Sequence, residues 1–191
     1  MTGPADPRQD PRPQEQFSGS PAPRPVVRAR RREDLPGLLV LLQRTHEEEG
    51  YPVRAAAVRA DWIATPDELH GAVAVHADRV VGHVALHPAG QEEGDALAQW
   101  ERATGRSAPG LAVVSRLFTD RSVPGAGSLL LACAVQRAAE LERVAVLLVD
   151  PDSPARAFYG RRGWQEVGSA VQHWGSRVVD AVLMVPPGAR T

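Results

Sequence analysis

The chain contains no lysine, and this absence excludes several kinds of chemistry before any motif is considered. All 22 cationic side chains among the 191 residues are arginine. Without lysine there is no P-loop for a nucleoside triphosphate and no Schiff base for pyridoxal phosphate. The formal net charge of -1 also argues against general nucleic-acid binding, which needs a basic face to displace phosphate counterions. We therefore expect no nucleic-acid partner.

Cysteine and long apolar runs are also scarce. Cys133 is the single cysteine, so intramolecular disulfides and cysteine-rich zinc sites cannot form, and the chain suits a reducing cytoplasm. It lies in an apolar helical run, SLLLACAV, where it is expected to pack rather than react. No apolar run approaches the ~20 residues of a membrane span, and the N-terminus lacks the hydrophobic core of a signal peptide. We therefore expect a cytoplasmic protein without a membrane partner.

Proline is concentrated at the N-terminus, where residues 1–25 combine it with glycine, serine, glutamine and charged residues. Such a segment buries too little apolar surface to offset the entropy lost on ordering, so we predict a disordered tail. With 43% apolar residues overall, the chain is long enough for one domain with a real core. We expect this domain at residues 26–187, followed by a short tail at 188–191.

Apolar periodicity, caps and turn signals predict the elements of this domain. Asp34 is placed to cap the first helix, and Thr65 with Glu68 resembles a capping box. In chain order, the predicted elements are a strand at 26–30, a helix from 34 to about 48, a helical piece at 53–63, a helical turn after Thr65, a hairpin of strands at 71–77 and 79–87, a surface excursion at 91–109, a strand at 111–119, a helix at 127–141, a strand at 144–150, a helix from 154 to 163, and a last hairpin of strands at 164–172 and 178–185.

Three consecutive elements define the fold class. The strand at 111–119, the following helix and the apolar run VAVLLVD at 144–150 form a βαβ unit, whose two strands are parallel. The whole order predicts an α/β fold of the α+β kind, with a central mixed β-sheet flanked by helices.

A glycine turn, PGAGS at residues 124–128, joins the first strand of this unit to its helix. Gly125 and Gly127 leave room for a ligand near the main chain, where unpaired amides and the positive end of the helix dipole face it. The turn is thus either an anion site or a tight strand-to-helix connection. A dinucleotide site is disfavoured because Leu130 replaces the third glycine of GxGxxG.

A second motif, DSPARAFYGRRGW, occupies residues 152–164. Ser153 and Pro154 are typical of a helix start, and Gly163 of a left-handed exit. From the residues alone, Tyr159 is either a half-buried aromatic with one hydrogen bond or an acid beside a reacting group.

Together with RLFT at residues 116–119, the two motifs resemble the GNAT-superfamily N-acetyltransferases, over about residues 26–185. The family pattern Asn-x-x-Ala-x-x-Phe-Tyr-x-x-x-Gly-aromatic is matched, with Asp in place of Asn, by Asp152, Ala155, Phe158, Tyr159, Gly163 and Trp164. The resemblance implies a GNAT-like acyltransferase fold in which the parallel strands splay apart. It also implies acetyl transfer from acetyl-CoA to the amine of a small molecule or peptide, without a metal, by a monomer or homodimer.

The resemblance implies roles for particular residues. Tyr159 is expected to donate a proton to the departing CoA thiolate. The cofactor-binding residues implied are Leu117, Phe118 and Thr119 for the pantetheine arm, Gly125, Ala126, Gly127 and Ser128 for the pyrophosphate, and Asp152 and Phe158. No metal ligands are expected, because His83 and His87 lie about 13 Å apart along one strand and cannot share an ion.

The glycine turn departs from the family pattern. Val123 and Pro124 stand near the expected cationic and glycine residues, and Pro124 has no amide to offer. Arg121 remains as a source of positive charge. These departures leave two alternatives to an enzyme: a noncatalytic acyl-CoA-binding sensor and, more weakly, a nucleotide-binding protein that uses PGAGS alone.

The general base and the acceptor stay open. The candidates for the base are a backbone-held water, which ranks first, and the side chains of His83, His87, Glu48 and Glu49. Both histidines are expected on a solvated strand. The acceptor site is expected between residues 46–51 and 173–176, which flank the thioester end.

Overall fold

The computed structural model describes residues 24–53, 57–90, 94–174 and 176–190. The predicted tail at 1–25 lies outside this range except for its last two residues, and so do Gly175 of the predicted last hairpin and the terminal Thr191. Within the described ranges, no helix is both long and apolar enough to cross a membrane.

Seven strands form one sheet in the order β1-β2-β3-β4-β5-β7-β6. They are β1 (Val26–Ala29), β2 (His70–His76), β3 (Arg79–Pro88), β4 (Leu111–Thr119), β5 (Val144–Val149), β6 (Gln165–Trp174) and β7 (Arg177–Val185). β4 and β5 are parallel, and the other pairs are antiparallel. This arrangement confirms the predicted mixed sheet with one parallel pair.

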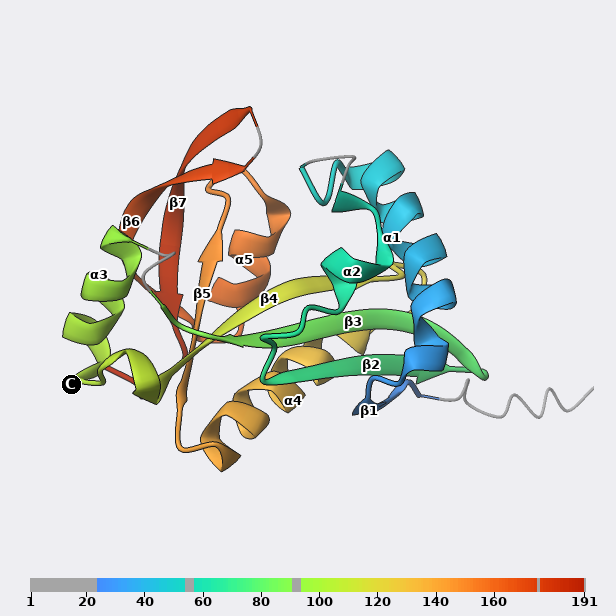
Figure 1. Cartoon of the computed structure of the whole chain (residues 1–191), viewed down its shortest axis with the longest axis horizontal. Coiled ribbons are helices and arrows are strands. Elements are labelled where there is room, and N and C mark those ends of the chain that lie inside the picture. The colour runs from blue at the N-terminus through green and yellow to red at the C-terminus, as the bar shows by residue number, and fades with distance from the viewer. Residues whose placement is uncertain (1–23, 54–56, 91–93, 175, 191) are drawn as a thin grey trace, which may run out of the picture.

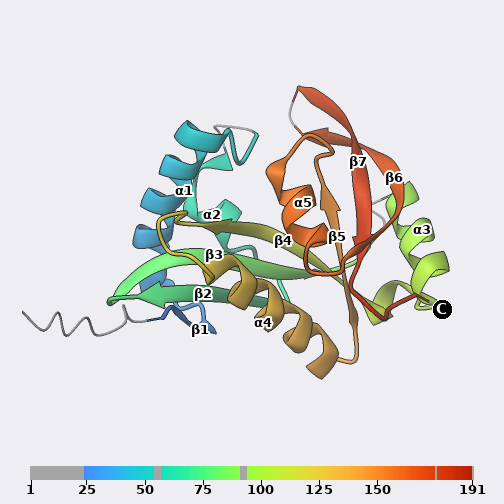
Figure 2. The same cartoon turned by 180° about the vertical axis from the view of Figure 1, so that it is seen from behind.

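Helices cover both faces of the sheet. They are α1 (Leu35–Glu49), α2 (Ala60–Ile63), α3 (Asp95–Thr104), α4 (Ala126–Glu140) and α5 (Pro154–Gly160), with short 3-10 turns at Arg32–Asp34 and Ala108–Gly110. α4 and α5 share one apolar core with the sheet, and Figure 2 shows α4 lying across that face. α1 and α2 pack on the opposite face with β2 and β4, and α3 packs there near β6 and β7 (Figure 1).

The parallel strands β4 and β5 stay together only briefly. Residues 111–113 of β4 pair with 144–146 of β5, and no further pair follows between these two fully described strands. β5 continues with β7, whereas β4 remains beside β3. Figure 1 shows β4 and β5 running apart. The divergence coincides with a bulge in β4 at Arg116, whose φ of 52° lies in the left-handed region. The predicted splay of the parallel strands is therefore present.

The prediction of a surface excursion at 91–109 is wrong, because this segment contains α3. Ala96, Trp100 and Thr104 are buried, and Trp100 has no exposed surface. Their spacing of four residues is a helical stripe that packs near β6 and β7. The polar residues between them mask this stripe when the segment is judged by its mean polarity.

Two predicted caps also form other contacts. Asp34 precedes α1 without capping it, and its carboxylate pairs with Arg28 at 2.7 Å. The segment after Thr65 is a turn rather than a helix, and Glu68 pairs with Arg30 at the end of β1. Among the described residues of 53–63, α2 is shorter than the predicted helical piece. Both carboxylates are therefore bound by arginines at or next to β1, and Asp34 also accepts a hydrogen bond from the backbone of Arg31.

Candidate active site

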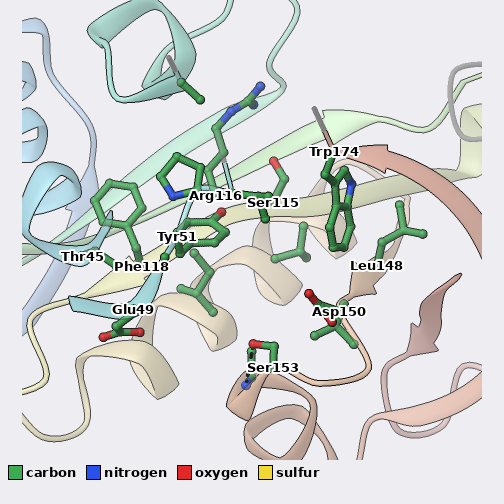
Figure 3. A pocket seen from close by; sticks show the side chains of 18 of the residues that line it. Thr45, Glu49, Tyr51, Ser115, Arg116, Phe118, Leu148, Asp150, Ser153 and Trp174 are labelled. Atoms are coloured by element: carbon green, nitrogen blue, oxygen red, sulfur yellow. Dashed lines mark hydrogen bonds between the residues drawn. The ribbon is translucent and has the colours of Figure 1, made fainter. Parts of the chain in front are cut away.

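A cavity of about 1350 Å³ opens between the diverging strands. Its walls come from β4, β5, the C-terminal end of α1, α5 and the β6–β7 hairpin. Figure 3 shows Tyr51, Phe118 and Arg116 on one side and Trp174, Leu148 and Asp150 on the other. The predicted motifs therefore converge on one concave space.

The β4 wall offers a free backbone edge. Leu117 and Thr119 line the cavity, and Phe118, which also borders it, is largely buried against the core beneath α1. Phe118 and Thr119 pair with β3 on one side of the strand, while the described register gives them no partner on the β5 side. Such an edge can pair with an extended ligand arm.

The glycine turn forms the N-terminus of α4. Gly125 has a φ of 88°, and the first helical bond runs from Leu129 N to Gly125 O at 3.1 Å. The amides of Ala126, Gly127 and Ser128 precede that bond, so the fold places all four predicted turn residues at the positive end of the helix.

Gly127 also brings two motifs together. A Cβ added there would meet the Phe158 ring at 3.4 Å. The ring of α5 therefore packs directly on the first turn of α4, at a position where a larger side chain would separate them.

Arg162 supplies a cation beside this turn, which the sequence analysis missed. Its Nε lies 3.2 Å from Ser128 Oγ, Nη1 donates to Phe158 O at 2.8 Å, and the guanidinium carbon is 3.6 Å from the centre of the Phe158 ring. Burial, and then the neighbouring Arg161 charge, lowers the pKa of Arg162. Arg162 lies in the turn after α5, and its place within the second motif, four residues after Phe158, was the available signal.

Arg121, the cation expected from the sequence, is engaged elsewhere. Its guanidinium pairs with Glu49 at 2.6 Å, which joins the loop after β4 to the end of α1. Arg44 and Asp120 form a second link at 2.7 Å. The loop is therefore fastened to α1 by two ion pairs.

Tyr159 lies on α5, inside the cavity wall. The predicted helix start is confirmed, because Ser153 Oγ accepts from the backbone, and Gly163 has the predicted left-handed φ of 79°. The Tyr159 side chain is 7% exposed and lies 5.3 Å from the Phe158 ring and 5.8 Å from the Trp164 ring, centre to centre. Burial raises the pKa of Tyr159 well above its ordinary value, so the phenol remains protonated at neutral pH.

A second phenol, Tyr51, faces the same space. It stands edge-on to Trp62, with 5.9 Å between ring centres. Burial and the neighbouring Tyr159 raise the pKa of Tyr51, whereas the Arg116 charge lowers it. Tyr51 therefore lies near both groups, although the sequence indicated it only as a boundary of the acceptor region.

The two histidines of β3 are not solvated as predicted. His83 is fully buried: its Nε2 lies 2.9 Å from Arg30 Nη1, and its Nδ1 lies 3.1 Å from Arg116 O. Because arginine only donates, Nε2 accepts and Nδ1 carries the hydrogen, which makes the ring neutral. His87 borders the cavity, and its Nδ1 lies 2.9 Å from Ser115 Oγ. Burial lowers the pKa of His83 to about 3 and that of His87 to about 4.

These positions narrow the candidates for the base. His83 does not line the cavity, whereas His87, Glu48 and Glu49 do, and Glu49 is held by Arg121. Glu48 and Glu49 would act from the end of α1, and His87 would act from β3.

Asp152, the remaining predicted cofactor residue, borders the cavity at the start of α5. Its side chain is 86% exposed and lies 3.7 Å from Arg177. Arg177 is also bound by Asp150 at 2.6 Å, which ties β7 to the end of β5. In the part of the chain that the structure describes, no cluster of three potential ligands could hold a metal ion.

The sequence matches the model of the acetyltransferase (GNAT) family over residues 7–164. The chain belongs to the GNAT acetyltransferase family. This GNAT protein is therefore an acyltransferase, and its mixed sheet is the expected GNAT-like fold. No curated protein matches its sequence.

Solved structures share the fold at low sequence identity. FeeM, an N-acyl amino acid synthase from uncultured soil microbes, has a TM-score of 0.64 and 19% identity, covering 87% of this chain and 91% of its own. Arabidopsis thaliana NAA60 in complex with acetyl-CoA has a TM-score of 0.63 and 17% identity, covering 84% and 98%. Escherichia coli YhbS in complex with CoA has a TM-score of 0.55 and 22% identity, covering 87% and 83%.

The buried neutral His83 makes stability depend on pH. An unfolded histidine has a pKa of about 6.5, so below that pH the unfolded chain binds a proton that the native His83 does not. We predict that the free energy of unfolding falls as the pH is lowered towards 3, by up to ~1.4 kcal/mol per pH unit from this residue. Urea denaturation between about pH 7 and pH 5.5 measures this slope.

The matched variants are His83→Gln and His173→Gln. Glutamine retains a donor and an acceptor without titrating, so His83→Gln should reduce the slope, while His87, whose pKa burial also lowers, keeps part of it. His173→Gln makes the same substitution at an exposed position. A wild-type slope in folded His83→Gln would contradict the assignment of a buried neutral imidazole.

Proposed function

We propose that this protein transfers an acetyl group from acetyl-CoA to the amine of a small molecule or peptide, with Tyr159 as the general acid. The observation that carries the proposal is a buried, protonated phenol lining the cavity between β4 and β5. The folds of structures with CoA or acetyl-CoA bound support this choice of donor.

The residues present fit such a donor along its length. The free edge of β4 at Leu117, Phe118 and Thr119 would pair with the pantetheine arm. The α4 amides at 126–128 and the αL turn at Gly125 would face the pyrophosphate. Asp152, just before α5, and Phe158, on α5, complete the proposed binding set.

Arg162 supplies a positive charge that the glycine turn itself lacks. The loop has no free cation near Val123 and Pro124, because Arg121 is paired with Glu49. Arg162, in the turn after α5, reaches the same end of α4 and contacts Ser128. We propose that its guanidinium binds the phosphates, which compensates for the missing loop charge.

The reaction needs one proton donor and one proton acceptor. The amine nitrogen attacks the thioester carbonyl, the new C–N bond replaces the C–S bond, and the sulfur leaves with the bonding electron pair. Tyr159 then gives its proton to that sulfur. Burial raises the pKa of Tyr159, and it would also raise the pKa of the CoA thiol in the same cavity. The difference in pKa between the phenol and the thiol is therefore smaller than the shift of Tyr159 by itself suggests. A water held by backbone groups remains the first candidate for deprotonating the amine.

Tyr159→Phe removes only the hydroxyl group. We predict that turnover falls by about 10²- to 10⁴-fold, the range expected for a lost general acid, while CoA affinity is retained. Thiol release from acetyl-CoA with an amine panel measures turnover, and calorimetry measures CoA affinity.

Tyr51→Phe is the matched comparison, since the chain has only 2 tyrosines. If Tyr51→Phe abolished turnover and Tyr159→Phe did not, the acid would be Tyr51. If the wild type bound CoA but released no thiol with any amine, the noncatalytic sensor would replace the enzyme.

Arg162→Gln tests the proposed phosphate contact. We predict about 10-fold weaker CoA binding from the loss of a charge-assisted hydrogen bond. Pantetheine, which lacks the phosphates, should bind both proteins equally. Arg137→Gln, near the far end of α4, is the control and should bind CoA like the wild type. An equal loss of affinity for CoA and pantetheine would show that Arg162 supports the fold rather than the phosphates.

A further inference from the structure

Arg116 stands at the acceptor side of the cavity, in an unusual backbone position. It occupies the bulge of β4 with a φ of 52°, a conformation that non-glycine residues rarely adopt. The bulge directs its side chain towards α2, where the guanidinium carbon lies 5.3 Å from the centre of the Trp62 ring. Nη1 also contacts the His87 ring, where Nε2 is the nearer nitrogen and Nδ1 lies at 3.3 Å. Figure 3 shows Arg116 on the same side of the cavity as Tyr51.

The other charged groups of this cavity are largely paired. Three arginines that border it each hold a carboxylate: Arg59 holds Asp61 at 2.8 Å, Arg121 holds Glu49 at 2.6 Å, and Arg177 holds Asp150 at 2.6 Å. Arg161 also borders the cavity without an ion pair among the described residues, but its side chain is exposed to solvent. Arg116, in contrast, forms no ion pair with any carboxylate of residues 24–53, 57–90, 94–174 or 176–190.

No neighbouring group among the described residues gives Arg116 the negative charge that a carboxylate would supply. His87 is neutral because burial lowers its pKa, and Trp62 offers only a ring face. Glu68 is bound by Arg30, and Asp67 interacts with Arg116 only over a longer distance. A partly buried cation is costly without an anion, so an anion is expected from a bound molecule.

We propose that Arg116 binds a carboxylate of the acceptor, which is then an amino acid or a similar amine with a carboxylate close to its nitrogen. The inference rests on the proposed function. A planar guanidinium matches a carboxylate through two parallel hydrogen bonds, and Trp62 supports the guanidinium from one face.

The location suits an acceptor rather than the donor. Tyr51 lies edge-on to Trp62, the Arg116 guanidinium lies over the same Trp62 ring, and Tyr159 borders the same cavity. The phosphates would instead lie at the α4 N-terminus, where Gly127 borders the cavity and Arg162 contacts Ser128. An amino acid bound to Arg116 would present its nitrogen towards the thioester end.

The experiment compares free amino acids with their carboxamides, which keep the amine and side chain but lack the carboxylate. Thiol release from acetyl-CoA is measured with the full chain. The wild type should favour amino acids over the matching amides by about 10- to 100-fold in kcat/KM. Arg116→Gln should lower kcat/KM for amino acids and leave that for amides unchanged, whereas Arg116→Lys should restore part of the preference.

Each outcome decides between defined alternatives. Equal use of amides by the wild type would overturn the inference and leave the proposed function standing. An undiminished preference in folded Arg116→Gln would overturn the role of Arg116. If the protein bound CoA but released no thiol with any amine tested, the proposed function would be overturned, and this inference with it. If Arg116→Gln does not fold, the wild-type ratio alone tests the carboxylate requirement.

Discussion

Two parallel strands, β4 and β5, share hydrogen bonds over residues 111–113 and 144–146 and then part. β7 takes over the pairing of β5, while β3 keeps β4, which bends at the Arg116 bulge. The freed edge of β4 carries backbone donors and acceptors that need partners. The cavity, the proposed donor site and the positions of α4 and α5 all depend on this separation, because a continuous ladder would close the space.

Positive charge is placed at two locations around that space. Arg162 contacts Ser128 at the N-terminus of α4, and Arg116 lies over Trp62 of α2. Neither arginine pairs with a carboxylate among the described residues, in contrast to Arg121 and Arg177. In the proposal, the phosphates of the donor bind Arg162 and the carboxylate of the acceptor binds Arg116. Each substrate is then oriented by its own arginine.

Local signals predicted much of this molecule. The βαβ unit, the glycine turn and the helix carrying Tyr159 follow from apolar runs and caps that act within a few residues. α3 was missed because its stripe, including Trp100, is outnumbered by polar neighbours. The burial of His83 depends on Arg30 and a β4 carbonyl, more than 30 residues away in sequence in each case. The sequence does not show which arginines near the motifs are available to a ligand, because that depends on which of them form ion pairs in the fold.

The central claim is that the free edge of β4 and the first amides of α4 hold the donor. Amide hydrogen exchange with and without CoA tests it most directly, because residues 117–119 have no partner on the β5 side and the first α4 amides precede the first helical bond. The account predicts slower exchange at residues 117–119 and 126–128 on CoA binding, with no change in α3. CoA binding that leaves both segments unchanged, or that protects β6 instead, would contradict it.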